Sequence, residues 1–389
     1  MKPQKNIGLI SVFSGLLLFL FFVLLSDPLS FQVSIDAAAT SLVRDLIAER
    51  QIESKNRNLT TMERNQVCDF SSRRTDVCEI NGDVRIHGNS STIQFITANS
   101  LSEEDHSWRI KPHPRKGDKI GIEVQFLIVD MKQWWFSKYR LILNQLTNYK
   151  IIDLDKENRV LCYPKATIGL EFHVEMSIDP SRTPKNRCSM EDFARMLRSS
   201  YSLEREMAIR LEENIVKKPR LMIIARKWSR SFTNIGEIVR MAEGLGFEAV
   251  VAECDVKSNL TEFAKTMNSF DVLMGVHGAG LTNLVFLPSN AIVIQVVPLG
   301  GLGGLSWEDF GRPSIDMKLR YLQYEISEDE STLIEEYPKD HPVFKDPSSI
   351  KKQGWLSLRE IYLIKQNVKL DVKRFKGVLL KALELLHDH

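Results

Sequence analysis

Residues 271–298, DVLMGVHGAGLTNLVFLPSNAIVIQVVP, contain the pattern around which the rest of the chain is organised. The apolar run Val272–Val276 predicts a buried strand, and the β-branched run Ala291–Val297 predicts a second one. Between them, the glycine-rich turn His277–Gly280 precedes a short helix expected over Leu281–Leu287. The stretch therefore predicts a strand, a tight turn, a helix and another strand, as in an α/β sheet.

A strand followed by a glycine turn and a helix N-terminus can bind an anion. Main-chain N–H groups and the positive end of the helix dipole then face one point. The spacing is not G-x-G-x-x-G and no Walker lysine follows, so neither a dinucleotide fingerprint nor a P-loop is supported. Two interpretations stay open: a phosphate cradle formed by Gly278, Ala279 and Gly280, or a tight turn that packs a structural histidine. Thr282 and Asn283 could likewise bind phosphate or cap the helix.

The composition is that of a globular protein. The 389 residues leave room for two domains, and 43% hydrophobic with 26% charged residues are ordinary values. A net charge of +2, without a basic run interleaved with aromatics, gives no reason to expect nucleic acid as a partner. The five cysteines have no zinc-like spacing. In an oxidising compartment, Cys68 and Cys78 are the natural pair because a short loop separates them, with Cys162 and Cys188 as a weaker second pair.

The N-terminus predicts the compartment. Residues 1–6 carry two lysines and no acid, and residues 7–25 are an uncharged apolar run. This length favours a signal-anchor transmembrane helix over a cleaved signal peptide, with a cytosolic tail at 1–6 and the remainder in the lumen. Either interpretation places the chain in the secretory pathway. Three glycosylation sequons agree with that, at Asn58, Asn89 and Asn259.

Residues 26–66 are polar and predict a stem, followed by a first α/β domain over 67–204 and a second over 205–389. Strand and helix patterns alternate in both domains, which is typical of parallel sheets. In the first domain a strand is expected over Glu123–Asp130 and a helix over Trp134–Leu146. A charged helix over Arg205–Lys218 is expected to link the two domains.

Cations follow the first expected strand of the second domain. The strand Arg220–Ala225 is succeeded by Arg226, Lys227 and Arg230. A doubly wound sheet binds ligands at the carboxyl ends of its strands, so these cations are well placed for a diphosphate, although a solvated basic loop is the alternative. Glu253 ends the next expected strand, where a carboxylate could bind ribose hydroxyls or cap a helix.

Several motifs together resemble glycosyltransferase family 61, and in particular its plant branch of xylan arabinosyl- and xylosyltransferases. The C-terminal motifs are GVHGAGLTNLVFLP, QVVPLGG and DFG. The resemblance also covers Cys68–Ser71 with Cys78, GDVRIHG (82–88), EVQFLIVD…WWFSKY (123–139), IDPSRTP (178–184) and KQGW (352–355). It therefore spans most of the chain after the N-terminal segment, with the motifs in order.

The resemblance implies a GT-B-like fold, in which two Rossmann-like domains face a cleft, here preceded by one transmembrane helix. It implies a Golgi type II membrane enzyme that transfers a pentose (arabinofuranose or xylose), with inversion, from a UDP-sugar to xylan or a related cell-wall polysaccharide. The UDP would be held by Arg226, Lys227, Arg230 and the His277–Gly280 turn. His277 would stabilise the leaving diphosphate. The Asp-x-Asp motif, Asp153–Asp155, lies in the first domain, so no divalent ion is expected to be essential.

The sequence departs from the family in one place. Family members have a long stretch with a His-Asp-Phe-Thr-Asp-type motif within the first domain, whereas here residues 107–119 run almost directly into 121–127. The first domain is therefore expected to be incomplete, and the catalytic base is not assigned. A non-catalytic donor-binding or scaffold member of the family is the alternative to an active enzyme. A soluble nucleotide-binding oxidoreductase is disfavoured by the expected anchor and by the glycine spacing.

Overall fold

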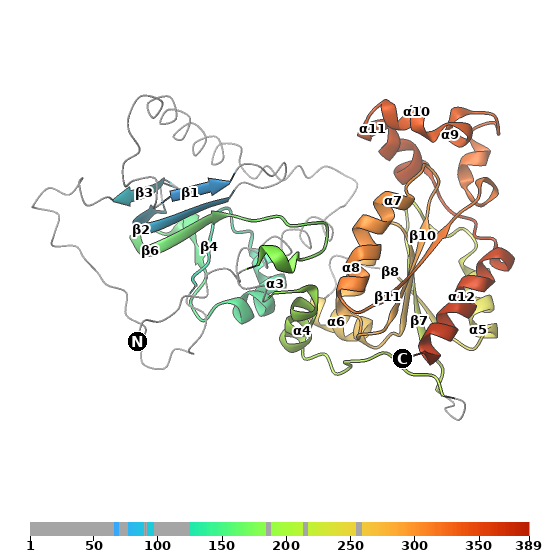
Figure 1. Cartoon of the computed structure of the whole chain (residues 1–389), viewed down its shortest axis with the longest axis horizontal. Coiled ribbons are helices and arrows are strands. Elements are labelled where there is room, and N and C mark those ends of the chain that lie inside the picture. Colours follow the sequence, from blue (N-terminus) through green and yellow to red (C-terminus); the bar gives the residue numbers. More distant parts are fainter. Residues whose placement is uncertain are drawn as a thin grey trace, which may run out of the picture. The chain divides into compact units, whose positions relative to one another are not determined.

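The computed structural model describes residues 66–69, 77–88, 90, 92–96, 124–183, 188–212, 217–253 and 259–388 (Figure 1). These residues form two compact units. The first contains the described residues up to His173 and 181–183, and the second contains 174–180 and 188–388. Within these ranges, no helix has the length and apolar character needed to cross a membrane. The predicted tail (1–6), transmembrane helix (7–25), most of the stem, Asn58 and Asn89 lie outside the described residues.

The first unit contains a four-stranded antiparallel sheet built on the long strand β2 (Val77–His87). One edge of β2 pairs first with β1 (Gln66–Asp69) and then with β3 (Thr92–Ile96), and the other edge pairs with β6 (Val160–Gly169). Cys68 and Cys78 lie opposite each other in β1 and β2 and form a disulfide, as the sequence predicted.

A small parallel βαβ segment completes this unit. It consists of β4 (Leu127–Ile128), α3 (Gln133–Leu146) and β5 (Ile152–Asp153), followed by the short 3-10 helix η4 (Leu154–Lys156). The helix predicted over Trp134–Leu146 is confirmed, and its apolar side chains Tyr139, Ile142, Leu143 and Leu146 are buried.

The described residues of this unit correct the expectation of a Rossmann-like sheet, because their main sheet is antiparallel. Buried and more exposed residues alternate along much of β2, and half-buried and exposed residues alternate along much of β6. Such alternation is typical of an antiparallel sheet with one solvated face, whereas parallel strands are apolar on both faces. The GT-B arrangement of two domains around a cleft stays a prediction.

The second unit is a five-stranded parallel sheet in the order β11-β10-β9-β7-β8. The strands are β7 (Arg220–Ala225), β8 (Glu248–Glu253), β9 (Val272–Val276), β10 (Ile292–Val297) and β11 (Arg320–Glu325). The strand order along the chain reverses between β7 and β9, which are hydrogen-bonded neighbours. This topological switch point is where doubly wound sheets bind ligands, at the carboxyl ends of the strands.

Helices cover both faces of this sheet. One face carries α5 (Ile235–Gly244) and α12 (Val372–His387), and the other carries α4 (Met190–Tyr201), α6 (Leu260–Asn268), the 3-10 helix η7 (Ala279–Phe286) and α8 (Arg312–Asp316) (Figure 1). Every residue of β9 and β10 is buried, which agrees with the nearly uninterrupted apolar runs of the sequence.

Short helical segments follow β10 and β11. They are α7 (Gly303–Ser306), the π-helix η8 (Trp307–Gly311), η9 (Glu328–Glu330), η10 (Thr332–Glu335), α9 (Pro342–Lys345), α10 (Pro347–Lys352), α11 (Trp355–Leu358) and the π-helix η11 (Arg359–Lys365). An apolar cluster that includes Val297, Leu302, Val343 and Tyr362 holds them to the carboxyl end of β10.

Three expectations about chain segments are corrected. Helix α4 belongs to the second unit, not the first, because Tyr201 packs edge-to-face on Phe286 at 5.7 Å. The described part of the predicted linker helix, 205–212, is not helical. The Arg205 guanidinium and the Ile209 N–H instead bond to the buried carboxylate of Asp271, which holds this segment extended. Cys162 and Cys188 do not form the second disulfide; the Cys188 thiol is buried and the Cys162 thiol is exposed.

Candidate functional site

The switch point brings together the loop after β7 and the turn after β9. Arg230, with φ of 53°, donates its main-chain N–H to Gln366 O at 2.8 Å. Its Nη1 donates to the main-chain carbonyl of His277, also at 2.8 Å. Arg226 Nε donates to Ser229 O at 2.9 Å, which holds the first arginine beside the second. Two of the three predicted cations are therefore fastened at the predicted turn.

The glycines of the turn have separate roles. At Gly278, with φ of 144°, an added Cβ would lie 2.6 Å from Arg230 Nη1 and 3.2 Å from Arg226 Nη1. Both guanidiniums therefore lie directly against this residue. At Gly280, a Cβ would lie 2.9 Å from Ile224 Cγ2, so this glycine allows the turn to pack on β7. Only glycine suits either position.

The arginines of this cluster repel one another. Burial, and then the nearby guanidiniums of Arg226 and Arg359, lower the pKa of Arg230 to about 9. Its Nε atom is buried and has no hydrogen-bond partner among the described residues. Positive charges held close together favour the binding of an anion between them. The sequence did not identify Arg359, which comes from η11 just after the KQGW motif.

The residue His277 lies close to this arginine cluster, and only 5% of its surface is exposed. Burial, and then the charges of Arg230 and Arg226, lower the pKa of His277 to about 3, so the imidazole is neutral at physiological pH. Its Nδ1 lies 2.7 Å from Gln295 Nε2, and its Nε2 lies 3.9 Å from a carboxylate oxygen of Asp309. Gln295 and Asp309 open the QVVPLGG and DFG motifs, but no sequence pattern predicts that either contacts His277.

Thr282 and Asn283 do not cap η7, which has no side-chain cap hydrogen bond at its N-terminus. Both are buried. The Thr282 hydroxyl donates to Ala279 O at 2.7 Å, and Asn283 Nδ2 donates to Gly280 O at 2.8 Å. They stabilise η7 from within, and η7 is a 3-10 helix where the sequence suggested an ordinary short helix.

Lys227 and Glu253 pair with each other. Their ion pair of 2.7 Å joins the carboxyl ends of β7 and β8, and both side chains are substantially exposed. The pair therefore lies beside the switch point on the side of β8. Asn259, the third sequon, is exposed, and its side-chain oxygen caps α6 by accepting from Thr261 N at 3.0 Å.

The Asp-x-Asp motif lies in the first unit and bonds within it. The Asp153 carboxylate pairs with Lys156 at 2.6 Å, and the Asp155 carboxylate accepts the Asp130 N–H at 2.5 Å. Across the described ranges, no group of three or more His, Cys, Asp or Glu side chains is arranged to hold a metal ion.

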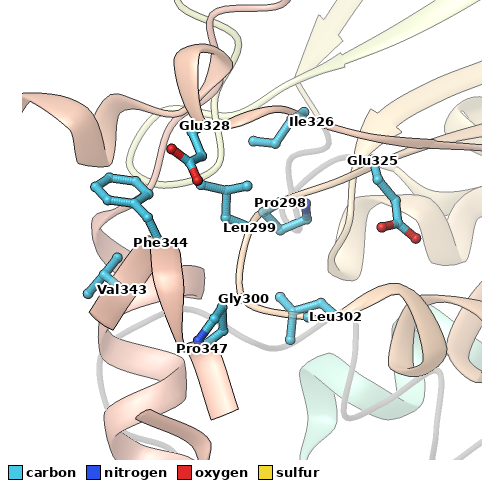
Figure 2. Close-up of a pocket in the computed structure, with 11 residues that line it drawn as sticks. Pro298, Leu299, Gly300, Leu302, Glu325, Ile326, Glu328, Val343, Phe344 and Pro347 are labelled. Carbon is cyan, nitrogen blue, oxygen red and sulfur yellow. The ribbon is translucent and has the colours of Figure 1, made fainter. Parts of the chain in front are cut away.

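A pocket of 130 Å³ lies at the carboxyl ends of β10 and β11 (Figure 2). The loop after β10 forms one wall, including Leu299 and Gly300, and Phe344 of α9 forms another. The Glu328 carboxylate at its rim pairs with Lys345 at 3.0 Å. The loop is closely packed, because a Cβ on Gly300 would lie 2.5 Å from the Tyr362 ring.

Comparisons with known proteins agree with the sequence motifs. A family model described as glycosyltransferase 61 matches residues 126–294. The chain is 42% identical over 378 aligned residues to alpha-1,3-arabinosyltransferase XAT3 of Oryza sativa subsp. japonica, covering 82% of this chain and 65% of that protein. It is 42% identical over 394 residues to beta-1,2-xylosyltransferase XYXT1 of the same organism, covering 82% and 84%. It is 30% identical over 416 residues to xylan glycosyltransferase MUCI21 of Arabidopsis thaliana, covering 87% and 83%.

The chain thus spans 65% of the length of the arabinosyltransferase that it matches. The alignment has 378 positions, but it includes only 82% of this 389-residue chain. Many aligned positions therefore hold a residue of the relative and none of this chain. That relative therefore carries residues within the aligned region that have no counterpart here. The motifs, the family match and the extent of the similarity lead to one conclusion: the chain belongs to glycosyltransferase family 61.

Proposed function

We propose that this chain transfers a pentose, arabinofuranose or xylose, from a UDP-sugar to xylan or a related cell-wall polysaccharide, with inversion at the anomeric carbon. The observation that carries the proposal is the pair of guanidiniums, Arg226 and Arg230, held against Gly278 at the switch point. Relatives at 42% identity are named as an arabinosyltransferase and a xylosyltransferase, which supports the sugar and the acceptor.

Transfer from a nucleotide sugar leaves a diphosphate, on which negative charge develops in the transition state. Fixed cations and hydrogen-bond donors aimed at that charge accelerate the reaction. Arg226, Arg230 and His277 would supply them, while Lys227 and Glu253 would contact the nucleoside side of the donor. An inverting reaction also needs a general base for the acceptor hydroxyl, and we assign none of the described residues to that role.

We further propose that the protein is a single-pass type II membrane protein of the Golgi, with its catalytic part in the lumen. The cationic tail and the apolar run over 7–25 support this topology. The three sequons would then be accessible to glycosylation. No divalent ion is required, because the arginines take the place that a metal would have at the diphosphate.

A second candidate function is donor binding without catalysis, as a scaffold for active relatives. The aligned arabinosyltransferase carries residues that this chain lacks, and the short connection between 119 and 121 is where the sequence motifs predict the missing segment. Such a protein would keep the cationic turn and bind UDP, but it would transfer nothing.

The test is a transfer assay on the purified full chain. UDP-arabinofuranose and UDP-xylose would be offered with xylo-oligosaccharides, and products would be identified by mass. Arg230→Ala would remove the central cation, and Arg240→Ala would remove an exposed cation halfway along α5 as a matched control. A pentose added by the wild type and by Arg240→Ala, but not by Arg230→Ala, supports the enzyme. UDP binding without product supports the scaffold, and the absence of both contradicts the proposal.

A further inference from the structure

Gln295 is a polar side chain in the middle of an apolar strand. Strand β10 reads Ile-Val-Ile-Gln-Val-Val, and Gln295 is 0% exposed. A buried amide is costly unless both of its ends are hydrogen-bonded. Here both ends are: one faces the hydroxyl of Tyr321 on β11, and the other faces the imidazole of His277.

The Tyr321 hydroxyl decides the orientation of this amide. The hydroxyl oxygen lies 2.6 Å from Gln295 Oε1 and 2.8 Å from Gln323 Oε1, and it has a single proton to donate. Gln323 is exposed, so its carbonyl can accept from water instead. Leaving the buried carbonyl of Gln295 without a donor would cost more, so the proton belongs to that bond. The NH₂ end of Gln295 then faces His277 Nδ1 at 2.7 Å.

We propose that Gln295, held by Tyr321, is a positioning residue that keeps His277 in the neutral tautomer with its proton on Nε2. An amide N–H that donates to Nδ1 requires a lone pair on that nitrogen, so the ring proton must be on the other one. Nε2 faces a carboxylate oxygen of Asp309 at 3.9 Å, and a carboxylate only accepts.

The other groups around the ring also bear on its protonation. Arg226 and Arg230 oppose a second proton, and so does the amide of Gln295, because an imidazolium would set two donors against each other. The Ser306 hydroxyl, 3.3 Å from Nδ1, can donate to the same lone pair. Asp309 favours a proton on Nε2. These groups therefore keep a single proton on the ring, on the nitrogen that faces Asp309.

The tautomer would affect binding of the donor, a consequence that rests on the proposed function. A diphosphate oxygen accepts hydrogen bonds and cannot donate them, so His277 can serve it only through an N–H. A neutral ring in the Nε2–H form is such a donor. It keeps this role at any pH at which the protein is folded and the ring takes up no second proton. Loss of one such hydrogen bond should weaken UDP binding about threefold to tenfold.

The tautomer can be read directly by nitrogen NMR on the full chain labelled with ¹⁵N-histidine. The signals of His277 are those absent from His277→Ala. In a neutral ring the two nitrogens differ strongly in chemical shift, and their couplings to the ring carbon-bound protons identify which one carries the proton. We expect Nδ1 to be the unprotonated nitrogen in the wild type.

Three variants test the role of Gln295. Gln295→Glu places a carboxylate at Nδ1, which can only accept, so Nδ1 should carry a proton near neutral pH. Tyr321→Phe keeps the ring against Trp307 but removes the bond that orients the amide, so the Nδ1–H tautomer should appear. Gln323→Met is the matched control on the same strand and should keep the wild-type spectrum.

Each outcome decides the inference. An Nδ1–H form in the wild type, or an unchanged ring in both Gln295→Glu and Tyr321→Phe, would overturn it. The expected spectra together with a threefold to tenfold weaker UDP affinity in Tyr321→Phe would support it fully. The expected spectra in a wild type that binds no UDP would support the positioning role and contradict the proposed function instead, so the two failures are distinguishable.

Discussion

Arg230 donates from its guanidinium to the main-chain carbonyl of His277 at 2.8 Å. This bond fastens the loop after β7 to the turn after β9, at the point where the strand order of the sheet reverses. Because the carboxyl ends of these two strands are neighbours, residues 47 positions apart in the chain form one cationic surface.

Replacing Gly278 with alanine should disrupt this surface. The new Cβ would lie 2.6 Å from Arg230 Nη1, on a backbone whose φ of 144° already disfavours any side chain. We expect a loss of about 1–3 kcal/mol in the free energy of unfolding and at least a tenfold weaker affinity for pyrophosphate. Urea unfolding and calorimetric titration measure the two effects.

Gly354→Ala is the matched control for this prediction. Gly354 also has a positive φ, 107°, but an added Cβ would meet open space. It should lose stability only through backbone strain and keep its affinity for pyrophosphate. Equal losses of affinity in both variants would show that Arg230 is not displaced at Gly278.

Burial of His277 should make the protein less stable in mild acid. Because its pKa is lowered from the ordinary 6.5 to about 3, the unfolded chain takes up a proton first as the pH falls. The free energy of unfolding should therefore decrease between pH 7 and pH 5, by roughly 2 kcal/mol from this residue alone. His277→Gln should remove that share of the pH dependence, measured by urea unfolding at the two pH values. His387→Gln, at an exposed histidine, should leave it in place.

The pair Lys227 and Glu253 should contribute to recognition more than to stability. Both side chains are largely exposed, and such pairs contribute about 0–1 kcal/mol to stability. If Glu253 binds ribose hydroxyls, Glu253→Gln should weaken UDP binding several-fold while leaving pyrophosphate binding unchanged. Parallel titrations with the two ligands check this, and equal weakening for both would assign Glu253 to the diphosphate instead.

Transfer should survive removal of divalent ions. Asp153 and Asp155 bond to Lys156 and to the Asp130 N–H within the first unit. Excess EDTA should therefore leave the transfer rate unchanged, and Asp155→Asn should affect stability without creating a dependence on added Mn²⁺. A rate that falls with EDTA and returns with Mn²⁺ would contradict this prediction.

Reduction of the Cys68–Cys78 disulfide should destabilise the first unit. The bond joins opposite residues of β1 and β2, and closing a loop of this size contributes about 2–4 kcal/mol. Unfolding of Cys68→Ser/Cys78→Ser should begin at lower urea concentration, while pyrophosphate binding by the second unit should persist. Loss of that binding would show that the second unit depends on the first.

Four of the five strands of the second unit could be predicted from the sequence, whereas β11 was not expected. Strands β7 and β9 begin and end where expected, because apolar runs bounded by glycine, proline and charged residues leave little choice of strand boundary. The main sheet of the first unit could not, because its strands β2 and β6 alternate in polarity and pair across a long stretch of chain. The prediction of a linker helix was also wrong for residues 205–212. Their charge pattern is typical of a helix, but hydrogen bonds to the buried carboxylate of Asp271 hold them extended.

The sequence by itself determined the family, the parallel sheet of the second unit and the residues that meet at its switch point. These follow from local patterns and ordered motifs, which need no knowledge of distant contacts. Only the tertiary structure decided what those residues do to each other. It pairs Lys227 with Glu253, turns Thr282 and Asn283 inward, adds Arg359, and places Gln295 and Asp309 at the two nitrogens of His277. Such relations depend on which strands become neighbours, and that is settled by the packing of the whole sheet.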